Sequence, residues 1–111
     1  MKIRLIIIAL VGIVIGFAAC KKDTDSVKPW IEINGYNPVY SELGKPYNDE
    51  GAVVWDVNAD GDTVNISGNL KVTSNVNIDV VGKYEVKYNA DDDAGNSADE
   101  VVRIVYIQVF K

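Results

Sequence analysis

Residues 81–90 read VGKYEVKYNA, and this stretch decides the fold class. From Tyr84 to Ala90, tyrosine, valine and alanine alternate with glutamate, lysine and asparagine. Successive side chains of a β-strand point to opposite faces of its sheet, so the alternation predicts a strand with one buried and one wet face. The stretch therefore predicts a sheet that packs on a core through one face.

The chain from Pro29 onward continues in the same style, with short apolar or alternating runs separated by glycine, asparagine and aspartate. No stretch has a sustained helical period. The expected strands are Trp30 to Asn34, Val39 to Ser41, Ala52 to Asp56, Thr63 to Ser67, Leu70 to Ser74, Tyr84 to Ala90 and Val101 to Val109. About seven short strands with turn signals between them predict an all-β sandwich.

The last expected strand is apolar on both faces, so its register stays open. One parity carries Val101, Val105 and Ile107, and the other carries Ile104 and Tyr106. A β-bulge or a covered outer face would each explain this pattern.

Six motifs follow one another in a fixed order along the chain. They are Trp30–Gly35, Gly44–Ala52, Asp56 with Asp60–Asp62, Val81–Tyr88, Asp92–Asn96 and Arg103–Val105. This order resembles the bacterial immunoglobulin-like (Ig-like) domain first described in pesticidal crystal proteins and common in surface lipoproteins. The resemblance spans essentially Pro29 to Lys111 and implies an Ig-like β-sandwich with no catalytic residues and no cofactor.

Two residues of this resemblance carry structural expectations. Gly82 followed by Tyr84 resembles a tyrosine corner, in which the phenol binds a backbone carbonyl at a crossover. Val86 stands where antibody domains have a cysteine, so packing alone would hold this sandwich together.

The first nineteen residues have the three parts of an export signal. Lys2 and Arg4 precede an uncharged apolar run from Leu5 to Ala19, which is short for a membrane-spanning helix of about 20 residues. Phe17-Ala18-Ala19-Cys20 resembles the lipobox of bacterial lipoproteins, although leucine is usual where Phe17 stands. We therefore expect a signal peptide over residues 1–19, or alternatively an ordinary secretory signal followed by an incidental cysteine.

Cys20 is the expected lipid attachment site because it is the one cysteine in the chain and it closes the leader. Residues 20–28 would then be the lipidated cysteine and its tether, and residues 29–111 the domain. The stretch Lys21 to Asp25 resembles the surface-export signals of Bacteroidota lipoproteins, which implies a surface-exposed outer-membrane lipoprotein. The expected membrane contact is the lipid anchor, with palmitate among its acyl chains.

Composition excludes several classes of function. Removing Lys2 and Arg4 with the leader leaves 9 of the 11 basic residues against 16 acidic ones, so nucleic acid is not an expected partner. The chain has no histidine, which rules out Ser/His/Asp and Cys/His nucleophilic sites. We therefore expect a protein that is not an enzyme.

Two acidic groups are weighed as metal sites. Asp56, Asn58 and Asp60 match the start of an EF-hand calcium loop, but its closing acid is replaced by Ser67. Asp91 to Asp93 with Asp99 and Glu100 could form a cation site or a paired-carboxylate hydrolase site. Solvated turns explain both groups as well, and we expect no bound metal.

Five of the ten aromatic residues lie in the first part of the domain. Trp30, Tyr36 and Tyr40 could form a stacking platform for sugar rings. Alternatively, Tyr47 and Trp55 belong to the core, and Tyr36 and Tyr40 lie at sheet edges.

These observations favour a membrane-anchored surface lipoprotein whose Ig-like module serves adhesion, binding or spacing, with an unknown protein or glycan ligand. The alternatives are a carbohydrate-binding accessory lipoprotein of a glycan-uptake system and a small hydrolase inhibitor. A fold alone does not name a ligand.

Overall fold

The computed structural model describes residues 27–111, so the expectations for the signal peptide, for Cys20 and for most of the tether lie outside the described residues. The described part is nearly all β, with one short 3₁₀ turn, η2 (Ser67–Asn69). Its strands are β3 (Trp30–Ile33), β4 (Val39–Glu42), β5 (Ala52–Val57), β6 (Thr63–Asn65), β7 (Leu70–Ser74), β8 (Gly82–Ala90) and β9 (Val101–Gln108). No helix among these residues is long and apolar enough to cross a bilayer.

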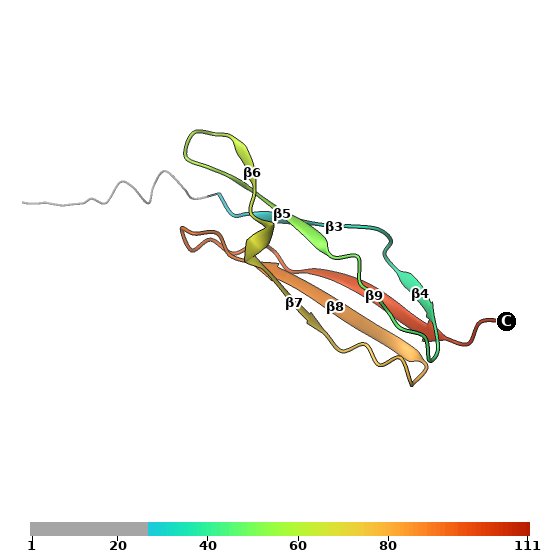
Figure 1. The fold of residues 1–111 in the computed structure, drawn as a ribbon. Helices are drawn as coiled ribbons and strands as arrows, with labels where there is room; N and C mark the ends of the chain where they lie inside the picture. The colour runs from blue at the N-terminus through green and yellow to red at the C-terminus, as the bar shows by residue number, and fades with distance from the viewer. Residues whose placement is uncertain (1–26) are drawn as a thin grey trace, which may run out of the picture.

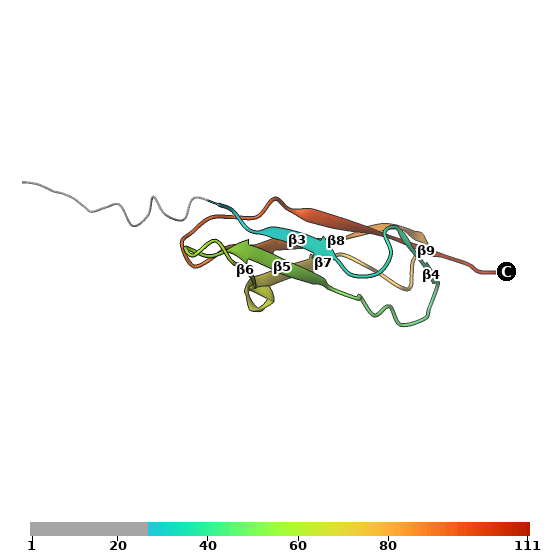
Figure 2. The same cartoon turned by 90° about the horizontal axis from the view of Figure 1, so that it is seen from above.

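The strands form two sheets, in the orders β3-β5-β6 and β4-β9-β8-β7. Figures 1 and 2 show the sheets as two stacked layers, with β3 lying over β8 and β9, and β5 over β7. All pairs are antiparallel except β4 with β9, which is parallel. This arrangement confirms the predicted Ig-like β-sandwich.

The core lies between the layers and is built from alternate residues of each strand. Val54, Val86, Tyr88, Val105 and Ile107 are almost completely buried. Burial of apolar area contributes about 25 cal/mol per Å², so this small set of side chains carries much of the stability of the domain.

The tyrosine corner forms as the sequence predicts. The Tyr84 hydroxyl donates to Val80 O at 2.6 Å, just before the chain turns into β8. This bond ties the loop that precedes β8 to the strand itself.

The register of β9 answers the question that its double apolar pattern left open. Pairing with β8 runs without a bulge from Tyr88 opposite Val101 to Gly82 opposite Ile107. Val105 and Ile107 point inward, whereas Ile104 and Tyr106 lie on the outer face and are half-buried.

The expected strand from Thr63 to Ser67 ends earlier than its sequence suggests, at Asn65. Ser67 N donates to Asn65 Oδ1 at 2.8 Å, and Ser67 Oγ accepts a bond from Val54 N at 2.9 Å. These side-chain bonds compete with the sheet ladder and start η2 instead.

The chain crosses from the first sheet to the second between β3 and β4. Because β4 pairs with β9 only from Val105 onward, the first half of β9 has no strand beside it on that flank. The Asn37 amide covers part of the gap: its Nδ2 donates to Val102 O at 3.1 Å and its Oδ1 accepts from Ile104 N at 2.9 Å.

Candidate functional site

A cluster of polar side chains crosses the interior of the sandwich, and we call Arg103, Asp49, Tyr47 and Tyr88 the Arg103 brace. Arg103 points inward from β9 and is 0% exposed. Its Nε lies 2.9 Å from Asp49 Oδ1 and 3.1 Å from the Tyr88 hydroxyl. The Tyr47 hydroxyl donates to Asp49 Oδ1 at 2.6 Å, and the Tyr88 hydroxyl donates to Asp49 Oδ2.

The guanidinium of the brace also holds backbone carbonyls. Arg103 Nη2 donates to Asn34 O at 2.7 Å and to Gly51 O at 3.0 Å, and its Nη1 donates to Tyr36 O. The brace therefore joins β9 to the crossover after β3 and to the turn before β5. Charge-assisted bonds of this kind are about twice as strong as neutral ones.

The electrostatics of the brace suit a structural role. Burial raises the pKa of the Asp49 carboxyl, but bonds from Tyr47, Tyr88 and Gly51 and the charge of Arg103 outweigh it, so the pKa of Asp49 is lowered. Burial and the bond to Asp49 raise the pKa of Tyr88 to about 12 and raise the pKa of Tyr47 as well. At neutral pH the brace is thus an ionised pair with two neutral phenols.

The brace predicts how stability depends on alkaline pH. A free tyrosine loses its proton near pH 10, whereas folded Tyr88 has a pKa of about 12. The stabilisation from Tyr88 is therefore full below about pH 10 and is lost as the pH rises from about 10 through about 12. Urea titrations across this range should show a falling free energy of unfolding, with a shallower fall for Tyr88→Phe. Equal slopes for the two proteins would contradict this assignment.

Sequence reasoning placed Asp49 and Arg103 in family motifs but assigned neither a role. The signal that could have found the brace is an arginine at 103, in the inward parity between Val101 and Val105. A buried arginine needs an ionised partner and several hydrogen bonds.

The acidic residues considered as a cation site, in the segment between β8 and β9, fix backbone turns and do not converge on one point. Asp92 is buried, and its carboxylate accepts bonds from Asn96 N at 2.7 Å and Asn96 Nδ2 at 2.9 Å. Burial raises the pKa of Asp92, but the hydrogen bonds with Asn96 and Asp56 lower it by more than burial raises it. The pKa of Asp92 is therefore below its usual range. Gly95, at φ +94°, makes the tight turn that this lock requires.

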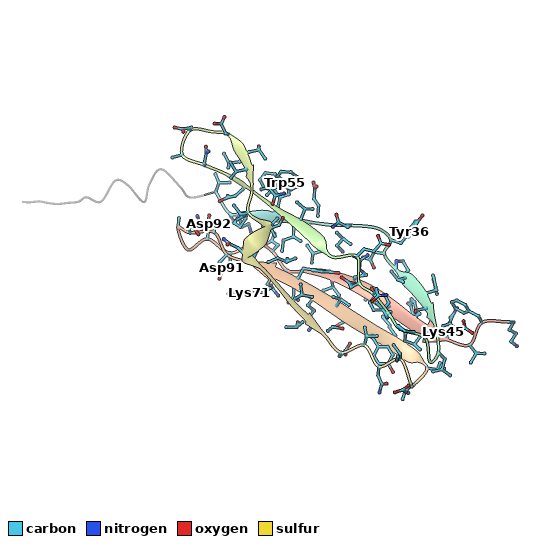
Figure 3. The ribbon with its side chains drawn as sticks, in the orientation of Figure 1. Tyr36, Lys45, Trp55, Lys71, Asp91 and Asp92 are labelled. Carbon is cyan, nitrogen blue, oxygen red and sulfur yellow. The ribbon has the colours of Figure 1, made fainter. Side chains whose placement is uncertain are left out.

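Three of the remaining acids of the candidate cation site bind other side chains, whereas Asp93 is exposed. Asp91 accepts the Ser97 hydroxyl at 2.6 Å and lies 3.5 Å from Lys71 Nζ, and Figure 3 shows Asp91 and Lys71 close together. Asp99 pairs with Lys28, while Glu100 accepts a bond from Asn89. Within residues 27–111, no three acidic or cysteine side chains gather in a way that could hold a metal ion.

The candidate calcium loop is likewise ordered by its own side chains. Asp56 is buried at the end of β5, whereas Asn58 and Asp60 are exposed. Asn58 Oδ1, an oxygen that calcium would need, accepts bonds from Asp60 N and Asp62 N, each at 3.0 Å.

We therefore predict that calcium does not change the stability of the domain. Thermal melts in millimolar calcium and in chelator should have the same midpoint, because a bound ion would raise it by mass action. A rise of several degrees with calcium, absent in Asp60→Asn, would show that the loop binds the ion.

The structure does not bring the three candidate platform residues together. Trp30 lies opposite Trp55 on the outer face of the three-stranded sheet. Tyr40 stacks on Tyr106 on the outer face of the other sheet, with ring centroids 5.2 Å apart and planes 13° apart. Tyr36 lies on the crossover between the sheets and is 80% exposed.

The alternative that placed Tyr47 and Trp55 in the core is half right. Tyr47 packs against the core and belongs to the brace. Trp55 is on the outer face, where its Nε1–H donates to Glu32 Oε1 at 3.0 Å (Figure 3). Its parity along β5 is opposite to that of buried Val54, which is why it points outward.

A hollow of about 330 Å³ lies on one flank of the sandwich. Its lining comes from the segment that leads into β3 and from the residues around the start of β9, namely Lys28, Pro29, Trp30, Ile31, Asp99 and Val101.

Comparison with known families decides what kind of domain this is. The family described as bacterial surface protein, Ig-like domain, matches residues 31–107. The chain belongs to the bacterial surface Ig-like family.

A solved structure agrees with this membership at the level of the fold. The lipoprotein BT2262 from Bacteroides thetaiotaomicron matches with a TM-score of 0.59 and 20% identity, over 75% of this chain and 39% of that one. The chain thus spans well under half the length of that lipoprotein. No curated protein sequence matches it significantly.

The range matched by the family includes the Arg103 brace but only part of the lining of the hollow. Bacterial surface Ig-like domains are typically non-catalytic, and the Arg103 brace falls wholly within the matched range. Lys28, Pro29 and Trp30 precede that range, so half of the lining of the hollow comes from outside it.

Proposed function

We propose that this chain is an outer-membrane lipoprotein, anchored through Cys20, that displays a non-catalytic Ig-like module for binding at the bacterial surface. Family membership supports a surface location, and the residues of the domain support binding rather than catalysis.

One observation carries the proposal: the ionised pair of the Arg103 brace is inaccessible to a substrate, whereas several aromatic side chains are exposed to solvent. Arg103 is fully buried and already bonded to Asp49 and to backbone carbonyls, so no substrate can reach it. Tyr40, in contrast, is 58% exposed on an outer face, and Trp30 is 39% exposed. Exposed aromatic residues are typical anchors for partners.

The shape of the domain suits display from a short tether. In Figure 1 the described chain begins at one end of the sandwich and its C-terminus lies at the other. About eight residues separate Cys20 from the domain, which allows at most roughly 26 Å of reach. The far end would thus face away from the membrane.

Protease treatment of intact cells tests this display. A protein on the outer surface should be lost when proteinase K is added to intact cells, whereas a periplasmic protein should be lost only after the outer membrane is opened. A periplasmic protein of the same cells serves as the control. Protection of the chain in intact cells, with full digestion in opened cells, would contradict surface display.

A carbohydrate-binding role is the second candidate, because Trp30 lines a hollow together with an exposed carboxylate and an exposed amine. That hollow offers a specific site at which the role can be tested.

A further inference from the structure

The hollow exists because the second sheet lacks a strand at this point. β4 joins β9 only at Val105, and Asn37 covers β9 at Val102 and Ile104. Ahead of these residues no strand lies beside β9 on this flank, and Pro29, Ile31 and Val101 line the hollow. Its volume of about 330 Å³ is at the lower end for small-molecule sites, which span about 300–1,000 Å³.

The lining combines an apolar floor with a polar rim. Pro29 and Ile31 are buried and Val101 is half-buried, whereas Trp30 is partly exposed. Lys28 Nζ lies 2.7 Å from Asp99 Oδ1, although both side chains are mostly exposed. An exposed ion pair is weak in water, so the ammonium and the carboxylate can each bind a ligand in place of the other.

These groups match the chemistry of a sugar ring. A pyranose has a C–H face that packs on an aromatic surface, and an indole supplies a large, rigid one. Its hydroxyls both donate and accept hydrogen bonds, while a carboxylate such as Asp99 accepts and an ammonium such as Lys28 donates.

The charge of the domain favours a sugar without acidic groups. Residues 27–111 contain 14 aspartates and glutamates against 7 lysines and arginines. Glu100 follows Asp99, which lines the hollow, and a field of this sign repels anionic ligands.

We propose that the hollow binds one uncharged sugar unit of a glycan, with Trp30 against the ring and with Lys28 and Asp99 on its hydroxyls. This inference deepens the proposed function, because it gives the surface module a ligand class. The sugar can belong to a free polysaccharide or to a glycolipid of the cell's own surface, since the hollow lies at the end of the domain where the tether begins.

Affinity electrophoresis of the full-length chain in detergent tests the proposal. The gels contain one of three uncharged polysaccharides: dextran, galactomannan or a β-glucan. We expect at least one to retard the wild-type chain, and Trp30→Ala to weaken that affinity about tenfold or more. Phe110→Ala, a change of an exposed aromatic residue near the C-terminus, should leave the affinity within about twofold and is the matched control.

Lys28→Met and Asp99→Asn keep the test informative if Trp30→Ala melts early, because they alter exposed side chains. Each should reduce retardation while leaving the thermal midpoint unchanged. Vesicles carrying a glycolipid with uncharged sugars distinguish the two sources. If the ligand is a glycolipid, the chain should bind these vesicles and not the free polysaccharides.

Two results would overturn the proposal. One is a wild-type chain that neither the three polysaccharides nor the glycolipid vesicles bind. The other is binding that survives all three hollow variants, which would place the site elsewhere on the domain. Neither result affects surface display, which proteolysis of intact cells tests separately.

Discussion

Replacing Arg103 with methionine should lower the free energy of unfolding by about 3–5 kcal/mol, the usual cost of removing one partner of a buried ion pair. The substitution leaves the Asp49 carboxylate without its cation and removes the guanidinium bonds to the carbonyls of Asn34 and Gly51. In a domain of this size each kcal/mol shifts Tm by about 4–8 °C, so Tm should fall by at least about 12 °C.

Chemical denaturation with matched controls measures this effect. Lys45→Met removes an exposed pair with Glu42, whose atoms are 3.9 Å apart, and should cost less than about 1 kcal/mol. Adding Asp49→Ala to Arg103→Met should cost little more than Arg103→Met alone, because the two residues act as a unit. If Arg103→Met unfolds at the same denaturant concentration as Lys45→Met, the brace does not hold the sandwich together.

The strands were predictable because their signal is local. Alternation along Tyr84–Ala90 and the turn residues between runs depend only on neighbours in sequence, and all seven expected strands are present. The boundaries shifted where side chains intervened, as at Ser67, whose hydroxyl binds Val54 N across the sheet.

The brace could not be derived from the sequence because its members are far apart along the chain. Arg103 and Asn34 are separated by 69 residues and meet only once both sheets are assembled. The arrangement of the aromatic residues was hidden for a similar reason. The crossover after β3 sends Trp30 and Tyr40 to different sheets, although they are close in sequence.

The proposed lipid anchor gives the second large expected effect. Cys20 is the one thiol of the chain, and it follows an apolar leader that is too short to span a bilayer comfortably. Each buried methylene of an acyl chain contributes about 0.8 kcal/mol, and a single chain holds a protein only reversibly, so two or three chains are needed for firm attachment. Cys20→Ala should therefore move the protein from the membrane fraction to the soluble fraction almost completely.

Lys21→Ala is the matched control for this change, since it alters the neighbouring residue and keeps the thiol. It should stay with the membranes as the wild type does. Thermal melts of both variants should agree, because both residues precede residues 29–111, over which we expect the domain.

Incorporation of labelled palmitate into the wild type and into Cys20→Ala tests the anchored-module account most directly. The account predicts strong labelling of the wild type and of Lys21→Ala, and none of Cys20→Ala. Equal labelling of Cys20→Ala, or an unlabelled wild type that still sediments with the membranes, would contradict it.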